Sequence, residues 1–505
     1  MTESNLKWAA HDNTITAALT RHAAEKPVDP ALYFEDDRIG YSDLNHAVNR
    51  LARKFQTHVQ RGDRIALYLP NSPAFVLLFL AGVRAGCDMQ VFDHEWPASV
   101  VRELASNLSS ALIVSTHDIN ADCRTVSMDD TFVPFADVAD SLGAPTDISG
   151  VAEPSTRTAF YTGFTSGSSG PPKGFRRDHL SWLESFANDQ IECPIHPHDT
   201  VVAPGALSHS LFLYALLRAL HAGSSVVFCR RFSTRNVARV ISAHAATILY
   251  SVPAQLGSLL RRKGSQLSTL RRVFTSGAKW PALWQDQYKI VFPNAELCEF
   301  YGASELSFVA IAKSAESPPI GSVGRAFSGV TIQIKDTAGK PVPTNEHGMV
   351  YVKSNMLFLG YADECHPTPP EEDGSATAAD LGFLDDRGFL YLLGRADRMI
   401  VVSGKNIYPE EIESCLAAHV AIENAAVIAE PDEKRGQRLI AIIDTGKSAT
   451  PTRLQLLRHC RQHLPQYKVP SIFALCANWP QTRSSKTDTN TLTLAWRQHE
   501  LSELT

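Results

Sequence analysis

Helical and strand-like spacings of apolar residues alternate through the first 150 residues of the chain. One set of apolar positions recurs every three or four residues and predicts an amphipathic helix: Leu44, Val48, Leu51, Phe55 and Val59. Short apolar segments then predict a strand over 64–69, a buried helix over 73–86 that ends at a glycine, and a strand over 110–115. Together these elements indicate α/β layers.

The alternation becomes regular in the middle of the chain. Between residues 201 and 252, predicted strands are separated by predicted helices with short turns, which is typical of a parallel sheet covered on both faces. Residues 321–361 are rich in strand and turn signals and predict a small β subdomain. We therefore expect an α/β fold, with a large N-terminal domain that contains layered parallel sheets, helices and this subdomain.

A separate pattern begins after residue 396. Its predicted strands span 399–402, 424–430 and 439–444, and its predicted helices span 409–416 and 452–464. This part has enough alternating apolar positions for a core of its own. The sequence therefore predicts two domains, an N-terminal one of residues 1–396 and a smaller α+β domain of residues 397–505.

Composition narrows the class of protein. The 505 residues are 44% hydrophobic and 20% charged, and the net charge of -5 gives no reason to expect a nucleic acid as partner. The nine cysteines contain no Cys-x-x-Cys pair, which suits a reducing compartment. The N-terminus lacks an apolar signal core, and the longest apolar run, 74–83, is about half of what spans a bilayer. We expect a cytoplasmic protein without a transmembrane segment.

The stretch 165–174, Thr-Ser-Gly-Ser-Ser-Gly-Pro-Pro-Lys-Gly, carries the strongest chemical signal. Its small residues allow backbone N–H groups and hydroxyls to approach an anion, and Lys173 adds a positive charge. Apolar residues precede it, so the loop is expected to leave the end of a strand. It lacks the Walker pattern, because prolines precede the lysine and a glycine follows it. The two interpretations are a phosphate cradle and a flexible polar surface loop.

This loop closely resembles the signature loop of the adenylate-forming (AMP-binding) superfamily, which includes acyl- and aryl-CoA synthetases, the adenylation domains of peptide synthetases and firefly luciferase. Further segments resemble other motifs of the superfamily in the same order: 272–278, 297–305, 380–395, 401–413 and 480–488. The chain departs from the pattern where Ala378-Ala379 replaces Thr-Gly, Ser304 replaces threonine and Ser485 replaces glycine. The resemblance covers nearly the whole chain and favours the acyl- or aryl-CoA synthetase type.

The resemblance implies an ATP site in the N-terminal domain. Tyr301 would stack on adenine, Ser304 would hydrogen-bond the α-phosphate, Glu305 would hold Mg²⁺, and Asp380 and Arg395 would contact the ribose. For Glu305 the alternative is a carboxylate that caps a helix N-terminus. The other residues implied in ATP binding are Thr165, Ser166, Gly167, Ser168, Ser169, Gly170, Lys173, Gly277, Ala278 and Gly302.

The resemblance also implies that the C-terminal domain is mobile. Lys486 would be the catalytic lysine, acting together with Ser304 and Glu305, although a lone lysine near a C-terminus is more often a solvated charge. Asp397 would be the hinge residue, and Ser403 and Gly404 would lie beside the CoA or pantetheine tunnel.

The acid pocket is less clearly marked. His209 lies where a strand is expected to end, which is where open α/β sheets place ligands, and the resemblance puts it in the acid pocket. A structural histidine is the alternative. The segment 207–211 lacks the aspartate with which amino-acid-activating members hold the substrate ammonium. Nearby apolar residues suit either a pocket for a fatty or aryl acid or the core: Leu211, Phe212, Tyr214 and Trp280.

The function implied by the resemblance is that of an ATP-dependent acid–CoA ligase, with ATP, Mg²⁺ and CoA as cofactors. It would convert a fatty or aryl acid, but not an α-amino acid, to an acyl-AMP with release of pyrophosphate, and then transfer the acyl group to CoA. One alternative is a stand-alone adenylating enzyme that loads the phosphopantetheine of a carrier protein. A less favoured alternative is a degenerate, non-catalytic nucleotide-binding module.

Overall fold

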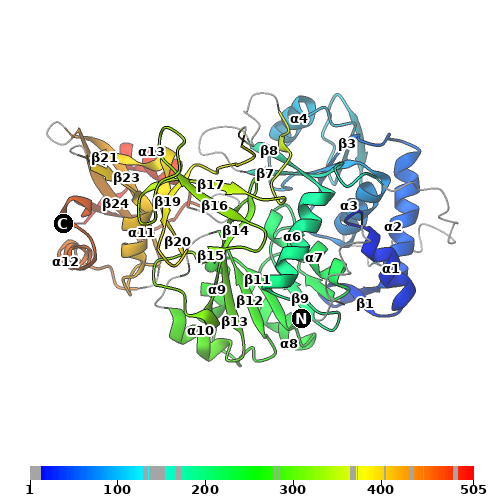
Figure 1. Ribbon diagram of the computed structural model, residues 1–505, viewed down its shortest axis with the longest axis horizontal. Coiled ribbons are helices and arrows are strands. Elements are labelled where there is room, and N and C mark those ends of the chain that lie inside the picture. The colour runs from blue at the N-terminus through cyan, green and yellow to red at the C-terminus, as the bar shows by residue number, and fades with distance from the viewer. Residues whose placement is uncertain are drawn as a thin grey trace.

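The structure is a computed structural model. It describes residues 13–128, 135, 154–165, 172–277, 280, 284–363, 371, 373–402, 405–432, 436–446, 448–481 and 487–504. Figure 1 shows the N-terminal elements at one end of an elongated molecule and the C-terminal elements at the other.

The larger sheet has nine strands in the order β15-β14-β13-β12-β11-β9-β10-β1-β2. Its strands are β1 (Pro30–Phe34), β2 (Asp37–Gly40), β9 (Thr200–Ala203), β10 (Ser225–Phe228), β11 (Ile248–Ser251), β12 (Arg272–Thr275), β13 (Glu296–Ala303), β14 (Ser307–Lys313) and β15 (Arg325–Ala326). Six adjacent strands of this sheet pair in parallel, in the spatial order β13-β12-β11-β9-β10-β1. The associated helices are α1 (Ala17–Glu25), α2 (Tyr41–Gln56), α7 (Ser210–Ala222), α8 (Thr234–Ala243), α9 (Pro253–Leu260), α10 (Gln285–Val291) and the 3-10 turn η2 (Ser314–Glu316).

Both faces of this sheet are buried, as its apolar strands predict. Successive residues of a strand enter different cores: Val201 and Val226 belong to the large core toward the second sheet, whereas Val202 and Val227 belong to a core beneath α8 and α9. The predicted parallel sheet covered on both faces is therefore confirmed.

The second sheet has seven strands in the order β18-β8-β7-β4-β3-β5-β6, of which β3 to β7 pair in parallel. Its strands are β3 (Arg64–Tyr68), β4 (Asp88–Val91), β5 (Leu112–Ser115), β6 (Arg124–Ser127), β7 (Ala159–Thr165), β8 (Lys173–Asp178) and β18 (Gly360–Tyr361), and its helices are α3 (Pro73–Ala85), α4 (Ala98–Asn107) and α6 (His179–Glu192).

Helix α3 has clear start and stop signals. The Ser72 side chain accepts a hydrogen bond from the Phe75 N–H, Pro73 occupies the first turn, and Gly86 ends the helix in the left-handed conformation. Almost all its residues are buried, because the helix lies in the large core.

The predicted β subdomain is a four-stranded antiparallel sheet in the order β16-β17-β19-β20. Its strands are β16 (Thr331–Lys335), β17 (Gly348–Lys353), β19 (Asp380–Leu384) and β20 (Leu390–Arg395). A turn joins β19 to β20 where the Asp386-Arg-Gly388 sequence predicted it.

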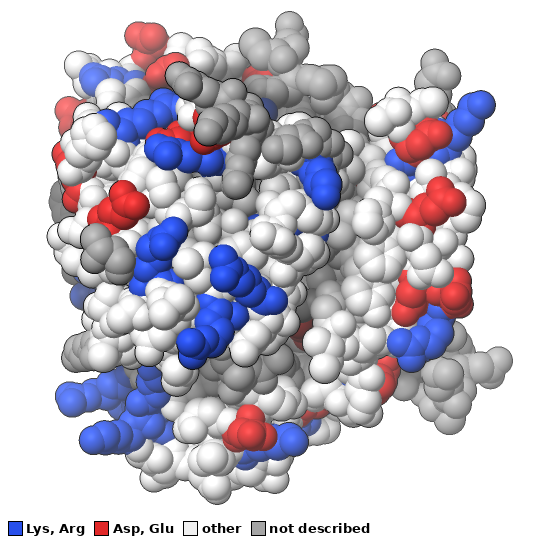
Figure 2. All heavy atoms as spheres, turned by 90° about the vertical axis from the view of Figure 1, so that its left-hand side faces the viewer, with Lys and Arg blue, Asp and Glu red and all other residues white. Residues whose placement is uncertain are grey.

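The C-terminal elements form two further sheets, a two-stranded one in the order β21-β22 and a four-stranded one in the order β23-β24-β25-β26, with their own apolar cores. They are η3 (Ala396–Arg398), β21 (Ile400–Val402), β22 (Lys405–Ile407), α11 (Pro409–Ala417), β23 (Asn424–Asp432), β24 (Gly436–Asp444), α12 (Arg453–His463), η4 (Gln466–Lys468), β25 (Ile472–Leu475), α13 (Thr489–Arg497) and β26 (Ser502–Glu503). Figure 2 looks onto this end, where acidic and basic side chains are interspersed. Within the described parts of the chain, every helix is too short or too polar to cross a membrane.

Candidate active site

Three motif segments meet at one edge of the nine-stranded sheet. Strands β9, β11, β12 and β13 are parallel neighbours, so their carboxyl ends lie along the same edge. His209 follows β9 and occupies the position directly before α7, Gly277 follows β12, and Ser304 and Glu305 follow β13. Gly277 has φ +92°, a left-handed conformation that glycine adopts without strain. The sheet topology thus brings together residues up to 96 positions apart, counting from His209 to Glu305.

Tyr301, Asp380 and Arg395 form a polar cluster between two sheets. The Tyr301 hydroxyl, on β13, donates a hydrogen bond of 2.5 Å to Oδ2 of Asp380, the first residue of β19. Arg395 ends β20 directly opposite Asp380, with its Nε 3.6 Å from Oδ1. Burial, together with the Asp380 carboxylate, holds the pKa of Tyr301 well above its usual value, so the phenol remains a donor. The carboxylate is thereby held in one orientation.

Glu305 is tied to the strand that follows the Gly/Ser loop. The Tyr361 hydroxyl, on β18, donates a hydrogen bond of 3.1 Å to Glu305 Oε1. Tyr361 in turn pairs with Phe175 on β8, two residues after Lys173. Lys173 lies opposite Thr165 across the β7–β8 hairpin, so the loop leaves a strand end as predicted. The turn that carries Glu305 is thus connected, through Tyr361 and β8, to the strand that begins at Lys173.

Arg177 is a site residue that the sequence interpretation missed. It is 3% exposed and donates hydrogen bonds to the backbone carbonyls of Ser304, at 3.2 Å, and of Met356, at 2.8 Å. Burial lowers the pKa of Arg177 to about 10, and the nearby Asp178 and Glu305 carboxylates oppose this shift. The guanidinium therefore holds the turn that carries Ser304 and Glu305. A possible signal was the charged pair Arg176-Arg177 inside an otherwise buried strand.

Asn71 has a similar supporting role beside His209. Its amide donates to the carbonyls of Gly205 and Cys229, and its Oδ1 accepts a hydrogen bond from the N–H of Leu207. The buried amide thus positions the loop between β9 and α7. The sequence places Asn71 in a Pro-Asn-Ser-Pro stretch, but only the fold shows which loop it contacts.

Several predicted site residues lie outside the described residues: Ser166, Gly167, Ser168, Ser169, Gly170, Ala278, Ser403, Gly404 and Lys486. The described residues that flank two of these segments pair with each other as strands. Val402 pairs with Lys405, and Gln481 forms an antiparallel bridge with Thr487.

The apolar residues near His209 belong to the core. Phe212 and Tyr214 are buried in the large core, and the Tyr214 hydroxyl donates to Asp189 Oδ2 at 3.3 Å. Trp280 packs edge-on against Trp284 and Tyr288 in the second core. Of the two interpretations left open for these residues, the structure favours core packing.

The Ala378-Ala379 departure has a structural consequence. Ala379 has φ +61°, a conformation that an alanine adopts only with strain. Its carbonyl accepts a hydrogen bond of 2.9 Å from Ala396 N–H, so the strained residue links the start of β19 to η3. Asp397 lies in η3 and is exposed. Asp380 itself is placed next to Arg395, so the departure leaves this pairing intact.

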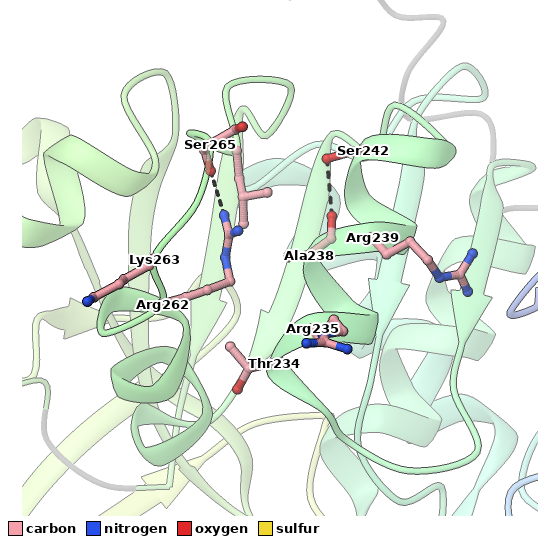
Figure 3. A pocket seen from close by; sticks show the side chains of 9 residues that line it. Thr234, Arg235, Ala238, Arg239, Ser242, Arg262, Lys263 and Ser265 are labelled. Carbon is pink, nitrogen blue, oxygen red and sulfur yellow. Dashed lines mark hydrogen bonds between the residues drawn. The ribbon is translucent and has the colours of Figure 1, made fainter.

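A basic hollow lies elsewhere on the large domain. Figure 3 shows it between α8 and the segment after α9, where Arg235, Arg239, Arg262 and Lys263 contribute side chains. Arg239 is paired with Asp36 at 2.6 Å. None of the motif residues lines this hollow, so it is not part of the candidate active site.

Comparison with known families adds to this geometry. The pattern of the family described as AMP-binding enzyme matches residues 19–362, and that of the AMP-binding enzyme C-terminal domain matches residues 411–486. The chain belongs to the AMP-binding enzymes. Within this family it is of the acyl- and aryl-CoA synthetase type, and the predictions of the superfamily and of an AMP-forming ligase are confirmed at the level of the family.

Individual relatives match this AMP-binding enzyme over nearly its full length. It is 34% identical over 479 residues to the uncharacterized acyl-CoA ligase YhfT of Bacillus subtilis (strain 168), covering 94% of this chain and 96% of YhfT. The o-succinylbenzoate-CoA synthetase MenE from Bacillus subtilis, bound to its acyl-adenylate intermediate, has a TM-score of 0.83 at 24% identity. The match covers 94% of this chain and 97% of the MenE chain. MenE bound to ATP and magnesium has a TM-score of 0.84 at 24% identity, covering 94% of this chain and 99% of the MenE chain. These structures confirm the fold class.

Proposed function

We propose that this AMP-binding enzyme is an ATP-dependent acid–CoA ligase that acts through an acyl-AMP. The observation that carries the proposal is the hydrogen bond from Tyr361 to Glu305, which connects the strand after the Gly/Ser loop to the acidic turn after β13. Thr165 and Lys173, the described residues at the two ends of the Gly/Ser loop, lie on strands that connect through Tyr361 to the Glu305 carboxylate. Together with the cluster of Tyr301, Asp380 and Arg395, this arrangement suits a nucleoside triphosphate and its metal ion. The relatives are named as CoA ligases or synthetases, which supports the proposal of an acid–CoA ligase.

In the first half-reaction, a carboxylate oxygen of the acid attacks the α-phosphorus of ATP, and pyrophosphate leaves with the bridging oxygen. The difficulty is the crowding of negative charge, so positioning and charge neutralisation dominate. Lys173 and the Gly/Ser loop would hold the leaving phosphates, and Ser304 would hydrogen-bond the α-phosphate. Asp380 and Arg395 would fix the ribose, while Tyr301 stacks on adenine.

A magnesium ion fits the residues present. Mg²⁺ takes one or two carboxylates and completes its shell with phosphates and water, and Glu305 supplies one carboxylate at the edge of the sheet. When bound there, the ion would supply neutralisation of phosphate charge. Tyr361 would hold Oε1 of Glu305 and so orient the carboxylate.

The second half-reaction transfers the acyl group from AMP to a thiol. The thiol sulfur attacks the acyl carbonyl carbon, AMP leaves, and the thiol proton is released to solvent. In our proposal, residues 1–396 and 397–505 are separate domains, and Asp397 is the hinge about which the smaller one turns. Lys486 would bind the acid carboxylate and α-phosphate in the first step and then withdraw, while Ser403 and Gly404 approach the pantetheine.

For the substrate, we infer a fatty or aryl acid, because the segment 207–211 has no carboxylate to hold an α-ammonium group. The relatives named for acyl and o-succinylbenzoate substrates support this class. CoA is the favoured thiol, and the phosphopantetheine of a carrier protein is the alternative.

A panel of acids tests the proposal. The full-length protein is incubated with ATP, Mg²⁺ and fatty, aryl or α-amino acids, and pyrophosphate and thioester are measured with free CoA or a holo carrier protein. We expect pyrophosphate release with a fatty or aryl acid and a thioester with CoA. Transfer to the carrier alone would support the alternative acceptor, and no release with any acid would reject the ligase.

Two variants separate the half-reactions. Lys486→Ala is expected to slow acyl-AMP formation by about a hundredfold or more, the size seen for lost oxyanion donors. Asp397→Pro is expected to spare pyrophosphate release and abolish thioester formation, because a hinge must change its backbone angles. Equal loss of both half-reactions in Asp397→Pro would argue against the hinge.

A further inference from the structure

A group of metal-ligand side chains lies between two helices of the C-terminal part. Cys415 is on α11, and His459 and His463 are one turn apart on α12. One ligand atom from each residue lies within 4.8 Å of the others. Cys415 and His459 are half-buried and His463 is exposed. None of the three belongs to the motifs that mark the candidate active site.

Hydrogen bonds already fix the protonation of both rings. His459 Nε2 lies 2.8 Å from the carbonyl of Cys415, and a carbonyl only accepts, so Nε2 carries the proton and Nδ1 keeps its lone pair. His463 Nδ1 lies 2.9 Å from the carbonyl of His459, which leaves the lone pair on Nε2. A backbone carbonyl bound to the second ring nitrogen is the arrangement usual for metal-ligating histidines.

A neighbouring histidine, His419, has no ring nitrogen with a free lone pair for a metal ion. The ring of His419 is 5.2 Å from that of His459, but its Nδ1 accepts a hydrogen bond from the N–H of Ala421. The lone pair of Nδ1 is therefore occupied, and the remaining nitrogen carries the proton. His419 thus serves as a matched control.

We propose that Cys415, His459 and His463 bind a divalent first-row transition-metal ion, with Zn²⁺ as the best match. A thiolate and two imidazoles suit Zn²⁺, whereas Mg²⁺ prefers oxygen ligands. Tetrahedral bond lengths place one sulfur and two nitrogen ligands about 3.3–3.6 Å apart, so the group must contract by at most about 1.5 Å, which the exposed His463 side chain can supply. Water would take the fourth position.

The ion would join α11 to α12, which already pack together through Leu416, Leu456 and Cys460. Because the site forms only when both helices are in place, binding stabilises the folded C-terminal part by mass action. Zinc binding is therefore expected to act on stability and to leave the residues of the adenylation site untouched.

Cobalt substitution tests the site directly. The full-length protein, free of any histidine tag, is reduced, stripped with a chelator and titrated with Co²⁺ and then with Zn²⁺. We expect one ion per chain at this site, a near-ultraviolet thiolate-to-Co²⁺ charge-transfer band that Zn²⁺ abolishes, and a higher melting temperature with Zn²⁺. Absence of the charge-transfer band in the wild-type protein would overturn the proposal.

Variants assign the ligands. Cys415→Ser is expected to remove the charge-transfer band, and His463→Gln to weaken Zn²⁺ binding at least tenfold and to abolish its effect on melting. Two control variants, His419→Gln and Cys123→Ser, are expected to change neither the charge-transfer band nor Zn²⁺ binding. Cys123 is a half-buried thiol outside this group. Because His463 is exposed, its variant should fold even if Cys415→Ser does not. Unchanged Zn²⁺ affinity in His463→Gln would refute the assignment.

Discussion

The hydroxyl of Tyr301 donates a hydrogen bond to Oδ2 of Asp380 at 2.5 Å, although 79 positions separate the two residues in the chain. The contact joins β13 of the nine-stranded sheet to the first residue of β19 in the four-stranded sheet. It orients the carboxylate that we propose as the ribose ligand, while Arg395 approaches the other oxygen. The nucleotide site therefore depends on how the two sheets are placed.

Asp380→Asn is expected to raise the KM for ATP by about tenfold or more, because hydrogen bonds to a charged group contribute about 1.5–3 kcal/mol. Tyr301→Phe keeps both the aromatic ring and the carboxylate and should have a smaller effect. The measurement is the ATP dependence of pyrophosphate release at saturating acid. An unchanged KM in Asp380→Asn would contradict the assigned role.

Glu305→Gln is expected to raise the Mg²⁺ concentration required for half-maximal activity by at least about tenfold, since the amide oxygen carries no net charge for the ion. Tyr361→Phe removes only the hydrogen bond to Oε1 and is the matched variant, with a smaller shift in the same direction. Magnesium titrations of pyrophosphate release measure both. If the two variants showed the wild-type magnesium dependence, Glu305 would not be the metal ligand.

Ala379→Gly is expected to increase the free energy of unfolding. A left-handed φ of +61° costs an alanine about 1–2 kcal/mol, and the greater flexibility of unfolded glycine offsets about 0.5–1 kcal/mol, so a gain of up to about 1.5 kcal/mol remains. The neighbouring Ala378 lies outside the set of positive-φ residues, and Ala378→Gly should be destabilising. Denaturant unfolding of the two variants compares them. Equal effects would show that the strain at Ala379 is relieved in solution.

His179 is expected to make the protein less stable as the pH falls. The N–H of Ile15 donates to His179 Nδ1 at 3.1 Å, and burial lowers the pKa of His179 to about 4. The unfolded chain binds this proton near pH 6.5, so between pH 6.5 and 4 the unfolded state holds more protons and stability decreases. From pH 7 to pH 5 the loss from this residue is about 2 kcal/mol.

Denaturant unfolding at the two pH values measures this loss. His179→Gln should reduce the pH dependence by that amount, whereas His58→Gln, at an exposed position, should leave it unchanged. Part of the dependence will remain in the variant, because burial also lowers the pKa of His22 to about 4. A pH dependence equal to that of the wild-type protein in His179→Gln would show that the ring is not held neutral.

The sequence by itself determined the order of the elements and the class of protein. Apolar spacing located α3, including its proline start and glycine end, because these signals act within a few residues along the chain. The motif series identified the family, because it is a local pattern of small and charged residues. The same pattern predicts Lys173, Glu305 and Asp380 as site residues.

Only the tertiary structure decided which of these side chains meet and what holds them. Arg177 and Asn71 act on backbone groups more than 100 positions away, and no local pattern records such a partner. The sign of φ at Ala379 and the core positions of Phe212 and Trp280 likewise depend on packing between distant segments. Contacts between sheets form when the chain closes on itself, so their geometry is a property of the whole fold.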